Sequence, residues 1–303
     1  MPKVAVVGAG QAGLLAAHAL HRQGHEVTLY SDRTPEDFLT KARPTGTAAR
    51  FEMSLAFERE LGLERWFDVA PHGEGIHLTF SPALDNQLLT LLGRFSKPFL
   101  AVDVRLQSAT WIRELDDRGG QVEIANVDVS MLEQIAAAND LTVVAAGRRE
   151  LQSLFPRDES RSSYREPQRI LGMVNVTGVA DVLPYAPWFR PVKFNFFAPF
   201  GEMFWVPWYS KDGHRAWSVL LEAKAGGPID QFKHAGSAEE LLGIAKRLIR
   251  DLCPWDADWI ADAVPCDDNA WLVGSFVPEV RQVVGTLPSG RHVMALGDTA
   301  QSL

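Results

Sequence analysis

The first hydrophobic positions of the chain form two short runs separated by a glycine-rich turn and an amphipathic segment. Residues 3–7 form a mostly apolar run rich in β-branched valine, which is typical of a buried parallel strand. Residues 8–13 turn into a helix that we expect to continue to about residue 23, with Gly24 as its C-terminal cap. Residues 26–30 alternate like a second strand. This order predicts one right-handed βαβ unit.

Helical and strand patterns alternate again in the middle of the chain. The helix expected over residues 130–138 should have Ser130 as its N-cap, with Glu133 completing a capping box. The segments expected here are a helix over 103–118, a strand over 121–124, a helix over 130–138 and a buried strand over 141–146.

The pattern changes to β structure after residue 167. Gly and Pro punctuate the strand-like runs, which favours an antiparallel sheet. The chain then carries an amphipathic helix with a serine cap and returns to one apolar strand. The expected strands are 169–177, 192–197, 203–208 and 216–221, followed by a helix over 237–252, extended chain over 273–284 interrupted by Pro278, and a strand over 291–296.

These patterns predict an α/β fold in which a second domain is inserted into a discontinuous nucleotide-binding domain. We expect the nucleotide-binding domain to comprise residues 1–70, 98–166 and 286–303. The inserted, mainly antiparallel β-sheet domain would comprise residues 71–97 and 167–285, and would bind the substrate.

Composition narrows the classes of protein that the chain could be. Of its 303 residues, 46% are hydrophobic and 22% charged, as in ordinary globular proteins. The formal net charge of −8 argues against a nucleic-acid or anionic-membrane surface, because both need clustered Lys and Arg. No apolar run is long enough to cross a bilayer. Cys253 and Cys266 have no metal or redox spacing, so we expect free thiols in a reducing cytoplasm, with a disulfide between them as the alternative.

The strongest chemical motif is Gly8-Ala9-Gly10-Gln11-Ala12-Gly13. Gly8 suits the tight turn, Gly10 lets a pyrophosphate approach the backbone, and Gly13 lets the helix pack closely on the strand. The helix N-terminus presents unpaired N–H groups to the phosphates. Because the motif follows a strand and opens a helix, it predicts a dinucleotide site formed by Gly8, Gly10, Ala12 and Gly13.

Two further positions bear on the dinucleotide. The acid that normally binds the adenosine ribose is replaced by Ser31, and Asp32 follows one residue later. Asp32 either reaches the ribose from this shifted position or is a solvated surface residue, and Arg33 could reach an adenosine phosphate. Gly297-Asp298 follows the final strand, where the Asp298 carboxylate could accept hydrogen bonds from ribityl hydroxyls.

One expected pair of residues is missing. Single-component aromatic hydroxylases carry an Asp-Gly pair, linked to NADPH use, after the strand that corresponds to residues 141–146. Here the chain reads Ala145-Ala146-Gly147-Arg148, and no second glycine-rich loop occurs. The sequence therefore gives no support for NAD(P)H binding.

The motifs together resemble the oxygenase component of the two-component styrene and indole monooxygenases. These are FAD-dependent proteins related to the p-hydroxybenzoate hydroxylase fold, with a glutathione-reductase-type, Rossmann-like FAD domain. The family continues past the Gly-Asp pair, so we expect this sequence to lack the family's C-terminal part. The resemblance is carried by VAVVGAGQAG, VTLYSDRTPEDF, ARPTGTA around Arg43 and Thr47, AVDVRL around Arg105, REPQRI, GEMFWVP and ALGDTAQ.

The resemblance implies a cofactor, a partner and site residues. Reduced FAD (FADH2) would come from a separate NAD(P)H-flavin reductase and react with O2 to give a C4a-hydroperoxyflavin, which epoxidises styrene- or indole-like alkenes. No catalytic side chain and no metal are implied, and the chain could be a homodimer. FAD contacts would come from Gly8, Gly10, Gly13, Asp32, Arg33, Arg105 and Asp298, with the Arg43–Thr47 loop beside the isoalloxazine ring.

The substrate pocket should be apolar, because the stretch from Tyr185 to Tyr209 is dense in aromatic residues. We predict that Phe196, Met203 and Trp205 line it, since strand alternation could place them on one face.

Three other functions remain open. The chain could be a self-sufficient NAD(P)H aromatic hydroxylase, a non-catalytic FAD-binding fragment, or a nicotinamide-only dehydrogenase. The last is disfavoured because hydride transfer does not require a second, aromatic-rich β domain.

Overall fold

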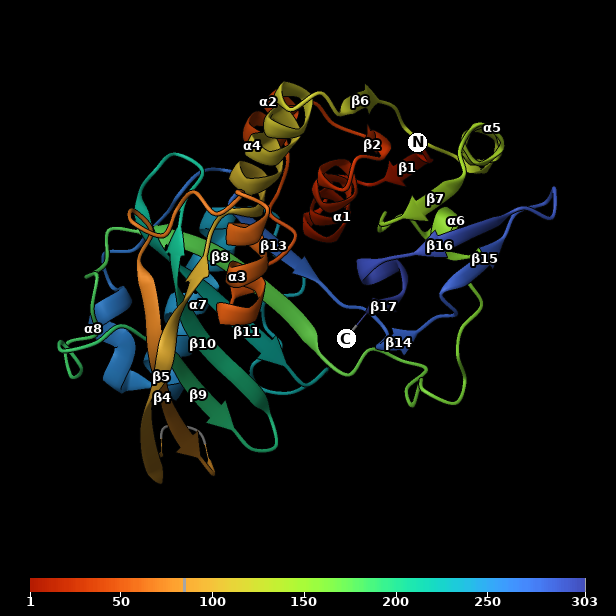
Figure 1. Ribbon diagram of the computed structural model, residues 1–303. Helices are drawn as coiled ribbons and strands as arrows, with labels where there is room; N and C mark the ends of the chain where they lie inside the picture. The colour runs from red at the N-terminus through yellow and green to blue at the C-terminus, as the bar shows by residue number, and fades with distance from the viewer. Residues whose placement is uncertain (84–85, 303) are drawn as a thin grey trace. The chain divides into compact units, whose positions relative to one another are not determined.

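The computed structural model describes residues 1–83 and 86–302 and divides into two compact units (Figure 1). The first unit is Met1–Lys41, Leu106–Pro167 and Phe276–Leu303, and the second is Ala42–Arg105 and Gln168–Ser275. These boundaries differ from the predicted ones at residues 42–70, 98–105, 167 and 276–285. The first two segments lie in the second unit because β3 and α3 pack on β5, a 13-residue strand that continues to Ala101.

The first unit contains a six-stranded sheet in the order β15-β16-β7-β1-β2-β6. All neighbouring strands are parallel except β15 and β16. The predicted βαβ unit is present, since β1 pairs in parallel with β2 and α1 connects them. The strands are β1 (Lys3–Val7), β2 (Glu26–Ser31), β6 (Gln121–Ile124), β7 (Leu141–Val144), β15 (Val284–Thr286) and β16 (His292–Ala295), and β14 (Glu279–Val280) pairs separately with β17 (Gln301–Ser302).

The three predicted helices α1, α4 and α5 lie close to their expected positions, whereas α2, α6 and η2 were not predicted. The cap of α5 differs: Asp128, rather than Ser130, accepts the hydrogen bond from the Met131 N–H. Glu133 forms no capping box and instead accepts hydrogen bonds from Ser289. The helices are α1 (Gln11–Arg22), α2 (Pro35–Thr40), α4 (Val104–Asp117, which begins in the second unit), α5 (Val129–Ala138), α6 (Arg149–Gln152) and the 3-10 helix η2 (Gly297–Thr299).

The second unit contains a nine-stranded sheet in the order β12-β8-β11-β10-β9-β4-β5-β3, with β13 also paired to β8. It is antiparallel except for the β4–β9 pair, as predicted for the inserted domain. The strands are β3 (Ala49–Arg50), β4 (His72–Ser81), β5 (Leu89–Ala101), β8 (Ile170–Thr177), β9 (Pro191–Phe197), β10 (Gly201–Tyr209), β11 (Arg215–Ala223), β12 (Val264–Pro265) and β13 (Trp271–Gly274).

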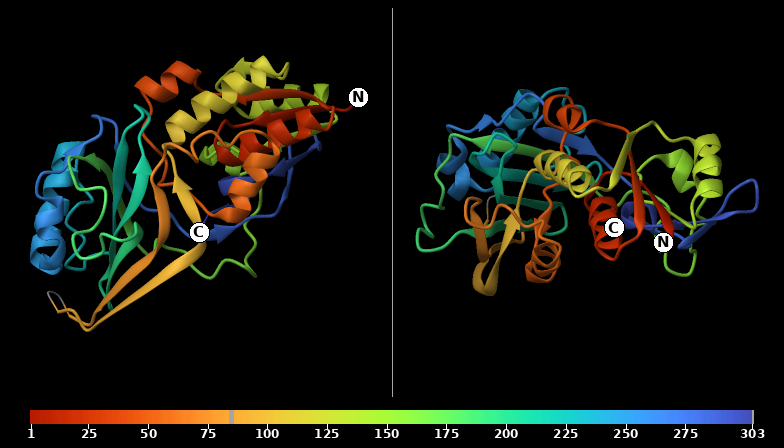
Figure 2. Two further views of the ribbon diagram at one scale, coloured as in Figure 1. Left: turned by 60° about the vertical axis from the view of Figure 1, so that its left-hand side comes forward. Right: turned by 45° about the horizontal axis from the view of Figure 1, so that its top comes forward.

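One face of this sheet is covered by α7 (Ala238–Leu252), which appears in blue in Figure 2. Ser237 caps α7 as predicted, by accepting a hydrogen bond from the Glu240 N–H. The apolar side of α7 packs with buried residues of β8, β10 and β11 into one hydrophobic core. The remaining helices of the unit are α3 (Glu52–Glu60), η1 (Pro254–Asp256) and α8 (Ala257–Ile260).

Two predictions from composition concern the whole chain. Both Cys253 and Cys266 are free thiols. Within the described residues, no helix combines the length and the apolar character needed to cross a bilayer.

Candidate functional site

The glycine turn of the first unit fits together as its spacing predicted. Gly8 has φ of 117°, a left-handed conformation that favours glycine, and a Cβ there would lie 2.4 Å from the Ala145 carbonyl oxygen. A Cβ on Gly13 would lie 2.0 Å from the Gly8 carbonyl oxygen. Both glycines are therefore required for α1 and β7 to approach the turn.

Gly10 differs from its two neighbours in the motif. A Cβ on Gly10 would meet no atom within 4 Å, so packing within the chain does not require this glycine. Gly10 is the N-cap of α1, no side chain caps the helix, and no acidic residue lies in its first turn. The helix N-terminus therefore keeps unpaired N–H groups beside open space, which fits a bound pyrophosphate.

The end of β2 carries the three residues predicted to meet the adenosine half of FAD. Ser31 is buried, and its hydroxyl donates a hydrogen bond to the Arg33 carbonyl oxygen at 2.6 Å, so it closes a local turn. Asp32 is exposed, and its carboxylate lies 3.7 Å from the Arg33 guanidinium. Because β1 and β2 are parallel, Asp32 projects at the same sheet edge as the glycine turn. Asp32 is thus free to accept a ribose hydrogen bond, and Ser31 is not.

The returning strand β16 brings Asp298 to this edge. Gly297 has φ of 60°, and a Cβ on it would lie 2.9 Å from the Ala12 Cβ, which places the Gly297-Asp298 pair against the start of α1. The Thr299 hydroxyl donates a hydrogen bond to the Ala146 carbonyl oxygen at 2.9 Å. The Asp298 side chain is exposed. Segments almost 300 positions apart in the sequence therefore meet at one edge of the sheet.

The position after β7, where an Asp-Gly pair would be linked to NADPH use, is occupied by Gly147-Arg148. Arg148 donates hydrogen bonds to the Asn126 side chain and to the Val127 carbonyl oxygen. Arg148 also occupies the N-cap position of α6, and its guanidinium lies 3.7 Å from the Glu150 carboxylate. This basic side chain is bound to its own unit.

In the second unit, the predicted flavin loop Arg43–Thr47 is held by side chains of the sheet. The Arg43 guanidinium lies over the Trp271 ring, 3.9 Å from its centroid. The Thr47 hydroxyl lies 3.2 Å from the Ser218 hydroxyl and 3.5 Å from the Met173 sulfur. The loop ends at Ala48, a non-glycine residue with φ of 53°. Both ends of this loop are therefore anchored on β8, β11 and β13.

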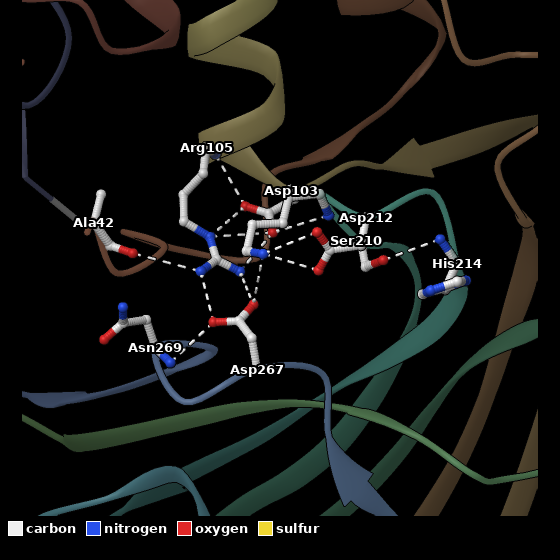
Figure 3. A network of polar contacts seen from close by, with 9 residues as sticks. Ala42, Asp103, Arg105, Ser210, Asp212, His214, Asp267 and Asn269 are labelled. Carbon is white, nitrogen blue, oxygen red and sulfur yellow. Dashed lines mark hydrogen bonds and ion pairs between the residues drawn. The ribbon is translucent and has the colours of Figure 1, made fainter. Parts of the chain in front are cut away.

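Arg105 lies in the second unit at the start of α4 and is 1% exposed (Figure 3). Its Nε donates to Asp103, its Nη1 to Asp267 at 3.0 Å and to the Ala42 carbonyl oxygen at 3.4 Å, and its Nη2 to both carboxylates. These acceptors match all five N–H groups of a guanidinium. Burial opposes its charge, but the two carboxylates outweigh burial and raise the pKa of Arg105.

This network changes the interpretation of Arg105. A direct hydrogen bond from Arg105 to FAD would have to replace one of its protein acceptors, whereas its bond to Ala42 holds the residue next to Arg43. Sequence reasoning missed Asp267 and Trp271, which hold the two arginines. The acidic residue two positions before Arg105 was the one local signal for the network, because Asp103 lies in the same motif.

The prediction that Phe196, Met203 and Trp205 share one face is wrong. In the β9–β10 hairpin Phe196 lies opposite Glu202, so alternation along β10 places Met203 and Trp205 on the other face. Met203 and Trp205 are fully buried in the core with α7, whereas Phe196 is half-buried and lines an open pocket. Of the three residues, Phe196 alone lies at a surface that a ligand could reach.

A buried polar cluster occupies the α7 side of the sheet near Met203. The Lys193 ammonium donates to Thr79 and Asn195 at 2.7 Å and lies 3.8 Å from the Asp256 carboxylate. Burial lowers the pKa of Lys193 to about 8, although Asp256 opposes the shift. Asp256 also accepts hydrogen bonds from Tyr185 and Asn195. These groups are one another's hydrogen-bond and ion-pair partners and connect η1 to the sheet, so we assign the cluster a structural role.

Comparisons with known proteins agree with this fold and these motifs. A family model described as "Styrene monooxygenase A putative substrate binding domain" matches residues 147–258, and one described as an NAD(P)-binding Rossmann-like domain matches residues 6–35. Styrene monooxygenase StyA from Pseudomonas fluorescens is 28% identical over 98% of this chain and 70% of its own length. StyA from a Pseudomonas sp is 27% identical with the same coverage.

Solved structures share the fold at lower identity. The flavin-dependent brominase Bmp2 superposes with a TM-score of 0.70 at 15% identity, over 100% of this chain and 73% of its own. A variant of the halogenase PltM in complex with FAD has a TM-score of 0.69 at 12% identity, over 99% of this chain and 64% of its own. The predicted α/β class with an inserted β-sheet is thus confirmed. These matches support a flavin-dependent monooxygenase, and they confirm that the chain resembles the styrene monooxygenases.

Proposed function

We propose that the chain is the oxygenase component of a two-component system that epoxidises styrene- or indole-like aromatic alkenes. It would take reduced FAD from a separate NAD(P)H-flavin reductase. In the balanced reaction, FADH2, O2 and the alkene give FAD, the epoxide and water. The observation that carries the proposal is the 28% identity to styrene monooxygenase StyA across 98% of the chain.

The residues present fit FAD in the first unit. Unpaired N–H groups at the start of α1 would bind the pyrophosphate beside Gly10. Asp32 would accept hydrogen bonds from the adenosine ribose, one position later than usual, and Asp298 from the ribityl chain. Asp32 is exposed at the strand end and has a charged neighbour in Arg33. Such an open ribose contact suits a cofactor that is exchanged between two proteins.

In the second unit, the loop Arg43–Thr47 would orient the isoalloxazine ring. Bound reduced FAD supplies the activation of O2 and the oxygen atom that is transferred. The part of this chain is to hold the ring and the substrate in a fixed geometry. The stacking of Arg43 on Trp271 and the contacts of Thr47 with Ser218 and Met173 restrict the loop before the ring binds.

The competing self-sufficient hydroxylase would need to bind NAD(P)H directly. The place of the Asp-Gly pair is taken by Gly147-Arg148, and the Arg148 side chain is engaged with Asn126 and Val127. This arrangement favours a separate reductase. A non-catalytic FAD-binding protein would keep the glycine turn but need no apolar surface for a substrate, whereas the second unit has one.

Nicotinamide consumption with and without a reductase tests the proposal. The chain mixed with FAD, NADH or NADPH, O2 and styrene should oxidise the nicotinamide no faster than the same mixture does without the chain. Adding a general flavin reductase should then give styrene oxide in amounts that depend on the chain. Nicotinamide oxidation by the chain alone would establish the self-sufficient hydroxylase instead. Retained FAD with hydrogen peroxide and no epoxide in either reaction would establish a non-catalytic binder.

A further inference from the structure

The sheet face opposite α7 carries a continuous row of apolar side chains. Strand pairing places Leu78 beside Phe194, Phe194 opposite Phe204, Phe204 opposite Leu220, and Leu220 opposite Met173. Because directly paired residues point to the same face, the five side chains form one row across β4, β9, β10, β11 and β8. The Phe194 and Phe204 rings are stacked, with centroids 4.6 Å apart and planes 10° apart.

The two ends of this row differ. At one end, the Met173 sulfur accepts a hydrogen bond from the Thr47 hydroxyl, in the loop that the resemblance places beside the flavin ring. At the other end is an open pocket of about 260 Å³ lined by Ile76, Leu78, Phe80, Phe194 and Phe196. Four strand spacings of about 4.8 Å separate Leu78 from Met173, which gives roughly 19 Å between the ends. The pocket is therefore remote from the loop, but joined to it by the row.

The chemistry of the pocket restricts what can bind there. All five lining residues have hydrocarbon side chains, so the pocket offers no side-chain hydrogen-bond partner to a hydroxyl or a carboxylate. Phe80 and Phe196 meet edge to face with centroids 6.0 Å apart, a geometry that a further aromatic ring can extend. Drug-sized ligands occupy pockets of roughly 300–1,000 Å³, so about 260 Å³ suits one or two rings.

We propose that this pocket is a capture site for small neutral arenes, and that the row from Phe194 to Met173 leads the captured molecule to the Thr47 loop. The assignment of the captured molecule as a substrate rests on the function proposed above. Leu78, Phe194, Phe204 and Leu220 are each half-buried, so the row presents apolar surface from the pocket as far as Leu220, and Met173 at the loop end is buried. A neutral arene can move along such a surface without losing hydrogen bonds, whereas a charged one cannot.

Direct binding tests the capture site without turnover or FAD. The probe is 4-fluorostyrene, observed by 19F NMR line broadening as the full chain is titrated. We expect binding to the wild-type chain and at least tenfold weaker binding to Phe196→Gln, which places an amide in the pocket. Phe95→Gln is the matched control, since Phe95 is a partly exposed phenylalanine on β5 outside the lining. The control should bind the probe as the wild type does.

A second variant tests the proposal in case Phe196→Gln fails to fold. Leu78→Trp fills the pocket with a large aromatic ring, and it should also weaken binding at least tenfold while circular dichroism shows a folded chain. Equal binding of 4-fluorostyrene to wild type, Phe196→Gln and Leu78→Trp would overturn the proposal. Equally tight binding of 4-fluorobenzoate would overturn the assignment to neutral arenes.

Turnover then links the pocket to the reaction. With reduced FAD supplied, Leu78→Trp should raise KM for styrene at least tenfold and leave kcat within about twofold, because capture is impaired but the Thr47 loop is intact. An unchanged KM would contradict the role of the pocket in capture. If the wild-type chain bound the arene but gave no epoxide, the proposed function would fail while the binding site remained.

Discussion

Replacing Gly10 with alanine is expected to weaken FAD binding while leaving the folded chain intact. Gly10 has φ of −78° and ψ of 177°, an extended conformation that alanine adopts readily, and its Cβ would meet no atom within 4 Å. A Gly-to-Ala change at a compatible position stabilises a protein by about 0.4–1 kcal/mol. The melting temperature of the apo chain should therefore stay unchanged or rise slightly.

The effect on FAD follows from the space that the methyl group would take. In the proposed complex, the pyrophosphate approaches the backbone at Gly10 and accepts hydrogen bonds from backbone N–H groups at the start of α1. A methyl group at this position should cost at least one charge-assisted hydrogen bond, worth about 1.5–3 kcal/mol. At 1.4 kcal/mol per factor of ten, the Kd for FAD should rise between about 10-fold and about 150-fold.

The other motif glycine gives the contrasting result. In Gly13→Ala, the new Cβ would lie 2.0 Å from the Gly8 carbonyl oxygen, so the backbone has to shift. Overpacking of this kind costs about 1–3 kcal/mol, so the melting temperature should fall by several degrees. The affinity for FAD should fall as well. Gly274→Ala is the control, since its Cβ would also meet open space but lies on β13 of the second unit.

The assay combines flavin fluorescence titration with thermal unfolding followed by circular dichroism. The account predicts that Gly10→Ala loses affinity with full stability, Gly13→Ala loses both, and Gly274→Ala loses neither. Wild-type FAD affinity in folded Gly10→Ala would refute the placement of the pyrophosphate at this turn.

Three further predictions concern the second unit. Asp267→Asn should lower the free energy of unfolding by about 2 kcal/mol, because it weakens the pair with Arg105. Burial tends to raise the pKa of Asp267, but Arg105 lowers it overall, so the stability that this pair contributes is lost as the pH falls below about 4. In urea unfolding, the free energies of unfolding of the wild type and the variant should therefore converge below this pH. Burial and a neighbouring carboxylate raise the pKa of Glu202 to about 7, so the free energy of unfolding of the wild type should fall as the pH rises from about 4 to 7. An equal fall in Glu202→Gln would show that ionisation of Glu202 is not the cause. Trp271→Leu removes the ring under Arg43 and should weaken FAD binding by about 2- to 30-fold in titrations, whereas unchanged affinity would exclude Arg43 from the flavin site.

Much of the fold was predictable because local periodicity determines it. The βαβ unit, α7 with its Ser237 cap, and the strands β8 to β11 follow from apolar spacing and turn residues within each segment. The cap of α5 shows where local signals fail. Asp128 and Ser130 are both good capping residues two positions apart; Asp128 is the cap, and Glu133, the expected capping-box partner of Ser130, instead accepts hydrogen bonds from Ser289, 156 positions away.

The candidate site was predictable only where its geometry is local. The glycine turn lies within six consecutive residues, and its steric requirements are those of the motif. The distant partner of Arg105, by contrast, is Asp267, 162 positions later, and nothing in the spacing of either residue indicates the other. Strand alternation gives the faces within one strand but not the register between strands, so Phe196 was wrongly grouped with Met203.

The central claim is that this chain transfers an oxygen atom from O2 with reduced FAD and without a nicotinamide site of its own. Its most direct test mixes the chain and chemically reduced FAD, under single-turnover conditions, with 18O2 and styrene in the absence of NADH, NADPH and reductase. The account predicts styrene oxide carrying one 18O atom, in an amount approaching that of the bound flavin. Complete conversion of the 18O2 consumed into hydrogen peroxide, with no labelled epoxide, would contradict it.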